Sequence, residues 1–216
     1  MRKIILAVVV VSFVVSSVHG QIKKGSIFLG GDISGSTLKT KSDDILTSKQ
    51  NGINISPVFG KAIKDNLILG VNAGFGISKT DNPVNDWRYN SDSYNAGVFV
   101  RKYKNLAASG FYIFLQGGLG LGYYHQKQEG PSPSNLDETK RISVGINAYP
   151  GISYAVGKRL HLETGFNNLL SLNYFTDKRE MGSPVTKYKT NGFSISSSLN
   201  NTTSSLYLGF RLLIGK

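Results

Sequence analysis

The chain of 216 residues lacks cysteine altogether and contains only two methionines and one tryptophan. The absence of cysteine excludes disulfide bonds, thiolate metal sites and cysteine nucleophiles. Charged residues make up only 18% of the chain, and beyond residue 15 no apolar run approaches the roughly 20 residues of a transmembrane helix. What the chain has instead is 25 glycines and 11% aromatic residues, a composition typical of a single domain built from strands and turns.

The N-terminus has the three-part pattern of a secretory signal peptide. Arg2 and Lys3 precede the apolar run Ile4–Val15, which is followed by the small and polar residues Ser16 to Gly20. As a helix this run extends ~18 Å, whereas the hydrocarbon core of a bilayer is ~30 Å thick, so a membrane anchor is the weaker alternative. We predict a signal peptide at residues 1–20, cleaved after Gly20, and one exported domain at residues 21–216.

Period-two alternation defines the central stretch of the chain, Leu67 to Ser78. Its odd-numbered positions are all apolar, and its even-numbered positions, apart from Ile68, are glycine or polar. A strand that crosses a bilayer at a tilt needs about 9 to 11 residues with one lipid-facing side. The pattern recurs along the chain and predicts eight strands: Ser26–Ser34, Ile53–Ile63, Leu67–Ser78, Tyr94–Lys104, Phe111–Tyr124, Ile142–Val156, Leu160–Tyr174 and Leu206–Ile214.

Long polar loops and short turns alternate between these strands, which is typical of an up-and-down meander. Three of the predicted loops are Thr37–Gln50, Lys79–Asp92 and Phe175–Gly192. An open sheet edge in lipid would leave backbone groups unpaired, so the prediction is all-β: an eight-stranded antiparallel up-and-down transmembrane β-barrel. Both termini then lie on the side of the short turns, the periplasm. The segment Phe193–Asn201 either extends the last strand or forms a separate hairpin arm.

Two prolines interrupt the predicted strands. Pro57 and Pro150 lie inside the second and sixth strands and cannot donate a backbone hydrogen bond. We therefore predict a bulge or a local break in the hydrogen-bond ladder at each.

Four stretches together resemble the outer-membrane protein β-barrel domain family, the small OmpA-like barrels. They are Pro57–Gly70, with the pattern D-N-L-x-x-G, Phe99–Tyr103, Tyr149–Tyr154 and Leu206–Arg211. The resemblance implies an outer-membrane barrel in a Gram-negative envelope, inserted by the barrel assembly machinery, in a family whose activities are mostly unknown. The chain departs from many such proteins by ending on Gly215 and Lys216 rather than on an aromatic residue.

Four charged residues fall on the inward face of the predicted strands: Asp32, Arg101, Glu163 and Arg211. Unpaired charges in a narrow lumen are costly, so we predict that these two acids and two bases form a paired network that fills the barrel. A gated pore that uses the same charges is the alternative. Eight strands leave room for side chains and little else, which favours the filled lumen.

Aromatic residues at the two ends of the strands are predicted to form interfacial girdles. Tyr94, Tyr123 and Tyr174 lie near the long loops, and Tyr103, Phe111 and Tyr154 lie near the short turns. For Trp87 and Tyr89, in the second long loop, two interpretations stay open: contact with an extracellular partner, or local packing.

The formal net charge of +12 raises the question of nucleic-acid binding. On the predicted topology the excess lies at one rim, on the short turns: Lys23, Lys24, Lys61, Lys64, Asp65, Lys102, Lys104, Lys158, Arg159 and Lys216. A basic rim suits anionic phospholipid headgroups, or simply keeps the turns solvated. We therefore expect outer-membrane lipid as a partner and no nucleic acid.

Evidence for catalysis is sparse. An outer-membrane lipid hydrolase could combine a serine with His125 and Glu129, but serine is abundant and the coincidence is weak. His161 is predicted at the opposite end of the barrel, and no metal-ligand cluster appears. We predict a monomeric barrel without catalytic residues, metal or cofactor, with a structural or surface-interaction role. The alternatives are the lipid-modifying hydrolase and a narrow channel.

Overall fold

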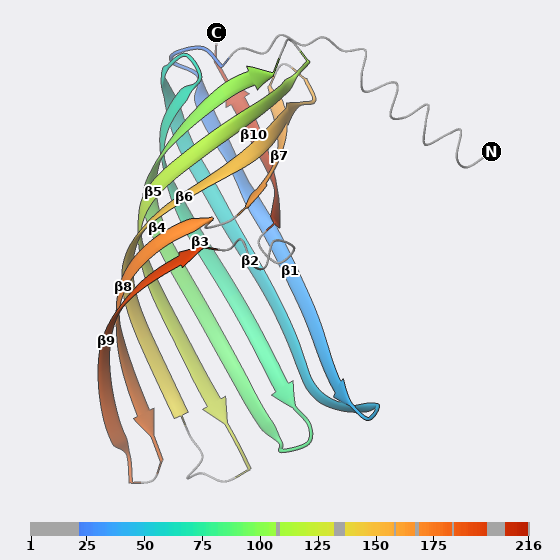
Figure 1. The fold of residues 1–216 in the computed structure, drawn as a ribbon, viewed down its shortest axis with the longest axis vertical. Coiled ribbons are helices and arrows are strands. Elements are labelled where there is room, and N and C mark those ends of the chain that lie inside the picture. The colour runs from blue at the N-terminus through green and yellow to red at the C-terminus, as the bar shows by residue number, and fades with distance from the viewer. Residues whose placement is uncertain are drawn as a thin grey trace, which may run out of the picture.

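The computed structural model describes residues 22–106, 109–131, 137–157, 159–166, 169–182, 184–197 and 206–215. These residues form one antiparallel sheet of ten strands (Figure 1). The strands are β1 (Ile27–Ser42), β2 (Ile45–Lys64), β3 (Leu67–Asn82), β4 (Trp87–Leu106), β5 (Phe111–Glu129), β6 (Asp137–Ala155), β7 (Leu160–Phe166), β8 (Leu170–Met181), β9 (Thr186–Ser197) and β10 (Leu206–Ile214).

The ten strands form eight passes along the wall of a barrel, and each pass is called a crossing here. Strands β1 to β6 are one crossing each, β7 and β8 share the seventh because both pair with β6, and β9 and β10 belong to the eighth. The sheet closes through the β5–β6 and β1–β10 ladders. The prediction of an all-β, eight-stranded antiparallel barrel is confirmed. In the described part of the chain no helix has the length and apolar character needed to cross a membrane.

The polar segments between the strands are strands themselves, so the prediction of long loops is wrong. Strands β1 and β2 continue to a tight turn at Asp43 and Asp44, which have positive φ angles of 49° and 62°. This is the backbone of a two-residue hairpin turn. Strands β3 and β4 extend likewise through the predicted loop Lys79–Asp92, and β8 and β9 through Phe175–Gly192. Polar side chains indicate that a segment is in contact with water, but they do not exclude a strand. A hairpin in water can keep its backbone hydrogen bonds between the two strands.

Both prolines lie at breaks in the ladder, as predicted. The β2–β3 ladder jumps from Ile55 to Val58 and so passes over Pro57. On β6, the partner changes from β8 at Ala148 to β7 at Gly151, and Pro150 lies between them. A proline has no N–H with which to continue the ladder there. The described Leu169 belongs to neither β7 nor β8, so the predicted continuous strand Leu160–Tyr174 is wrong.

The two faces of the sheet differ completely in character. Exposed apolar side chains cover the outside of every crossing, for example Ile33, Phe59, Val71, Val98, Leu119, Ile146, Leu172 and Leu208. We call the end where β1 begins and β10 ends the terminus end, and the end with the β1–β2 and β8–β9 turns the hairpin end. Toward the terminus end the inside is packed with buried rings: Phe28, Phe99, Tyr103, Tyr112, Phe114, Tyr149 and Tyr207.

Among the described residues, a ladder joins β1 to the last crossing only toward the terminus end. The β1–β10 ladder stops at Asp32 and Gly209, although β10 continues to Leu206 and β1 to Ser42. Within the described residues, the rest of β1 pairs only with β2, and β9 pairs only with β8. Figure 1 shows these two edges on opposite sides of the hairpin end. Phe193 to Ser197 belong to β9 and thus to a hairpin arm, while residues 198–201 lie outside the described part.

Candidate functional site

Four strands bring the four inward charges to one level of the lumen. Asp32 comes from β1, Arg101 from β4, Glu163 from β7 and Arg211 from β10. Each side chain points inward because the residues on either side of it in its strand point out toward the apolar belt. Arg101, Glu163 and Arg211 are 0 to 2% exposed.

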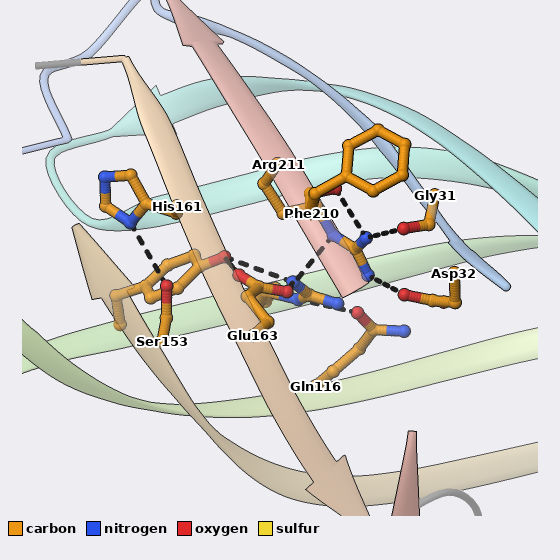
Figure 2. Close-up of polar contacts among 10 residues, drawn as sticks. Gly31, Asp32, Gln116, Ser153, His161, Glu163, Phe210 and Arg211 are labelled. Atoms are coloured by element: carbon orange, nitrogen blue, oxygen red, sulfur yellow. Dashed lines mark hydrogen bonds and ion pairs between the residues drawn. The ribbon is translucent and has the colours of Figure 1, made fainter. Parts of the chain in front are cut away.

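Glu163 lies at the centre of this network (Figure 2). Its Oε2 accepts a hydrogen bond of 2.6 Å from Arg101 Nη1 and lies 3.1 Å from Arg211 Nε. Its Oε1 accepts a 2.5 Å hydrogen bond from the hydroxyl of Tyr103. Arg211 also binds Asp32 at 2.7 Å, through Nη2. The two acids and two bases therefore balance, which is what makes their burial tolerable.

Other donors of the two arginines reach neutral acceptors, while the buried Arg101 Nη2 has no hydrogen-bond partner among the described residues. Arg101 Nε donates to Gln116 Oε1 at 2.7 Å, and Arg211 Nη1 donates to the carbonyl of Gly31 at 2.7 Å. The Arg101 guanidinium carbon lies 4.4 Å from the ring centroid of Phe114 and 5.2 Å from that of Phe28. Such contacts are strongest when, as here, water is excluded. The network spans the lumen between β1, β4, β7 and β10.

The prediction that Tyr103 lies in the aromatic girdle on the outside is wrong. The side chain is 3% exposed and belongs to the buried network. Tyr103 has the same parity along β4 as Phe99 and Arg101, which are both buried, so a regular strand must turn it inward. The alternation of inward and outward residues in the sequence therefore indicates an inward Tyr103. The prediction was wrong because it relied on the preference of tyrosine for membrane interfaces.

The other aromatic residues of the predicted girdles lie on the outside. Tyr94, Phe111, Tyr123 and Tyr174 are 37 to 49% exposed. Tyr154 is half-buried, with its ring 4.6 Å from that of Phe111. Trp87 and Tyr89 are half-buried on the outer extension of β4, and their contact with a partner stays a prediction.

A polar cavity of about 380 Å³ lies next to the network. Asp32, Gln116 and Tyr149 line it together with inward asparagines and serines: Asn54, Ser56, Asn72, Asn95, Ser143, Asn147, Ser171 and Asn173. Gly118, Gly120 and Gly122 of β5 also line it, so this side of the lumen has few side chains large enough to fill it. The inward residues thus change from aromatic to small and polar along the barrel.

Two histidines lie in the described part of the chain, His125 on β5 and His161 on β7. His125 Nε2 lies 2.9 Å from Glu138, and its Nδ1 lies 4.0 Å from Asp92, while Glu129 pairs with Lys127. Sequence reasoning missed one serine–histidine contact: Ser153 Oγ lies 3.1 Å from His161 Nδ1, and both residues are at most 1% exposed. Among the described residues no group of histidines and carboxylates could hold a metal ion.

At the hairpin end, ion pairs connect neighbouring strands. Hydrogen bonds from Lys140 and then His125 lower the pKa of Glu138 below its ordinary value. Arg141 binds Asp177 through two hydrogen bonds of 2.6 and 2.7 Å and so ties β6 to β8. These pairs are partly exposed to solvent, so each adds little stability on its own.

Comparison with known proteins bears on the fold. No family model and no curated protein matches the sequence. A major outer membrane protein from Thermus thermophilus has a similar structure, with 12% identity, a TM-score of 0.50, and coverage of 88% of this chain and 99% of that one. The chain has the fold of an outer-membrane barrel. The outer membrane protein OprG from Pseudomonas aeruginosa agrees, with 15% identity, a TM-score of 0.50, and coverage of 90% and 98%.

This barrel fold carries no activity over to the chain at such low identity. The resemblance of four sequence stretches to the family of small OmpA-like barrels stays a prediction, since no family model matches.

Proposed function

We propose that the protein is an exported, integral barrel of the bacterial outer membrane that does not conduct and that interacts with partners at the cell surface. The observation that carries this proposal is the buried network of Arg101, Glu163 and Arg211, which crosses the lumen and is packed between aromatic rings. A water-filled route would have to break several charge-assisted hydrogen bonds at once.

The outer surface supports the membrane assignment. Exposed apolar side chains occur on every crossing, which is the reverse of a water-soluble barrel. Polar hairpins extend beyond this belt on one side, and the basic short turns lie on the other. In an outer-membrane barrel the long hairpins face the exterior, so the polar cavity and the hairpins form the surface available to a partner.

Electrophoretic mobility tests the barrel itself. Outer-membrane fractions are run with and without boiling. A shift on heating supports a stable closed barrel in the membrane, whereas recovery of the protein in the soluble periplasm contradicts it. The same fractions give the processed mass and so test cleavage after Gly20.

A narrow channel is the second candidate, favoured by the polar cavity of about 380 Å³. Planar-bilayer recordings separate the two proposals. We expect no conductance steps from the wild type over many insertions. The Glu163→Ala and Arg101→Ala variants show whether removing the network creates conductance. Regular steps from the wild type would overturn the non-conducting proposal in favour of the channel.

A further inference from the structure

An apolar groove of about 640 Å³ crosses the outer wall of the barrel over β4, β5, β6 and β7. Its walls are two rows of outward side chains that follow the strand pairing. Lys102, Leu115 and Pro150 form one row, and Lys104, Ile113 and Ile152 form the next. Between the rows, the floor belongs to residues that turn inward, including the buried Tyr103 and Phe114.

The groove has its charge at one end only. Lys102 and Lys104 are exposed, and both lie on β4, one on each wall. No carboxylate among the described residues is within ion-pair distance of either ammonium group, although the chain has many such pairs at the hairpin end. The remaining lining is almost wholly apolar. An apolar trough that ends in two uncompensated lysines matches an amphiphile with a negatively charged head.

We propose that this groove is a binding site for one anionic phospholipid of the inner leaflet, with an acyl chain in the groove and the phosphate between Lys102 and Lys104. The groove belongs to the lipid-facing wall, and the lysines lie near the terminus end, where β4 ends. The site therefore rests on the proposed orientation in the membrane. Its volume lies within the range of small-molecule sites, about 300 to 1,000 Å³.

A diffuse attraction of lipid to the basic rim is the competing explanation, and a matched pair of variants separates the two. Lys102→Gln/Lys104→Gln removes two charges at the groove. Lys24→Gln/Lys61→Gln removes two charges from the same rim at exposed positions outside the groove lining. Each lysine near an anionic surface contributes about fivefold in affinity, so we expect about 25-fold weaker binding for the groove pair.

The shape of the groove has its own test. Thr164 is a half-buried residue of β7 in the groove lining. Thr164→Phe fills the groove without changing the charge, and we expect it to displace the lipid. Val71→Phe adds the same ring at an exposed outward position of β3, outside the groove, and we expect it to leave binding intact.

The measurement is native mass spectrometry of the full mature chain, titrated in detergent with phosphatidylglycerol and, separately, with phosphatidylcholine of the same acyl chains. We expect one retained phosphatidylglycerol, lost in the groove variants and kept in both controls. Equal loss in the two lysine pairs, equal retention of the neutral lipid, or a second protein copy in its place would each overturn the proposal. Heat-dependent mobility of every variant confirms that its barrel is intact, so failure of the lipid site is distinct from failure of the barrel.

Discussion

Arg101 Nη1 and Glu163 Oε2 lie 2.6 Å apart, with both side chains fully excluded from solvent. Because Arg211 lies against the same carboxylate, Glu163→Gln leaves two buried guanidinium groups with only Asp32 to balance them. Breaking a buried ion pair from one side costs about 3 to 5 kcal/mol. We expect Glu163→Gln to lower the free energy of unfolding by that amount, measured by urea unfolding in lipid vesicles.

The control is a pair at the hairpin end. Glu180 lies 3.0 Å from Lys187 with its side chain 45% exposed. Glu180→Gln removes the same charge, and we expect a change below about 1 kcal/mol. Equal effects of the two substitutions would mean that the network contributes little more than an exposed pair.

Gly151 of β6 lies beneath the ring of Phe114, and a methyl group there would overlap the ring and the backbone oxygen of Thr164. Overpacking of this kind costs about 1 to 3 kcal/mol. We expect Gly151→Ala to lower the temperature at which heat-dependent mobility changes. Gly157→Ala is the control because nothing lies within 4 Å of a methyl group at that position. A matching drop in the control would assign the effect to backbone flexibility instead.

The sequence predicts the inner and outer faces well because alternation in a strand is a local property. It assigns Asp32, Arg101, Glu163 and Arg211 to the lumen, where they meet. The same alternation places Tyr103 on the inner face. The general preference of tyrosine for membrane interfaces led to the wrong prediction. What alternation cannot give is the length of a strand in water: the polar segment Lys79–Asp92 keeps its ladder as a hairpin.

The pattern of residues within one strand also does not predict which distant strand it pairs with. Pro150 predicts a lost hydrogen bond, but not that β6 changes its partner from β8 to β7 there. The end of the β1–β10 ladder at Asp32 and Gly209 depends on the register of the whole barrel. Such features follow from closure of the sheet rather than from any one segment.

The contacts of Glu138 at the hairpin end contribute to stability in a way that depends on pH. Its pKa is lowered mainly by the hydrogen bond from Lys140, and then by that from His125. A lowered folded pKa means that this contribution to stability is present above the ordinary glutamate pKa of about 4.3 and is lost as the pH falls through the folded value. We expect Lys140→Gln to move the titration midpoint of Glu138 upward, measured by NMR of its carboxyl carbon. Lys79→Gln, which removes a partner of Asp81 on β3, should leave that midpoint in place.

Disulfide crosslinking can test the edges of β1 and β9 that lack a second partner among the described residues, because the chain has no cysteine of its own to interfere. Residues directly opposite in a ladder lie within the Cα separation of about 4.4 to 6.8 Å that a disulfide requires. Leu38 pairs with Gln50 on β2, and Ile195 pairs with Leu172 on β8. We expect the double cysteine variants at these two pairs to crosslink under mild oxidation, and Leu38→Cys/Ile195→Cys to remain reduced.

The third variant shares one cysteine with each of the other two, so poor reactivity of either position cannot explain a negative result. Ile27→Cys/Ile214→Cys, across the β1–β10 ladder near the terminus end, should crosslink and show that β1 and the last crossing do pair there. Efficient crosslinking between positions 38 and 195 would mean that the outer edges of β1 and β9 meet. The barrel would then be closed along its whole length.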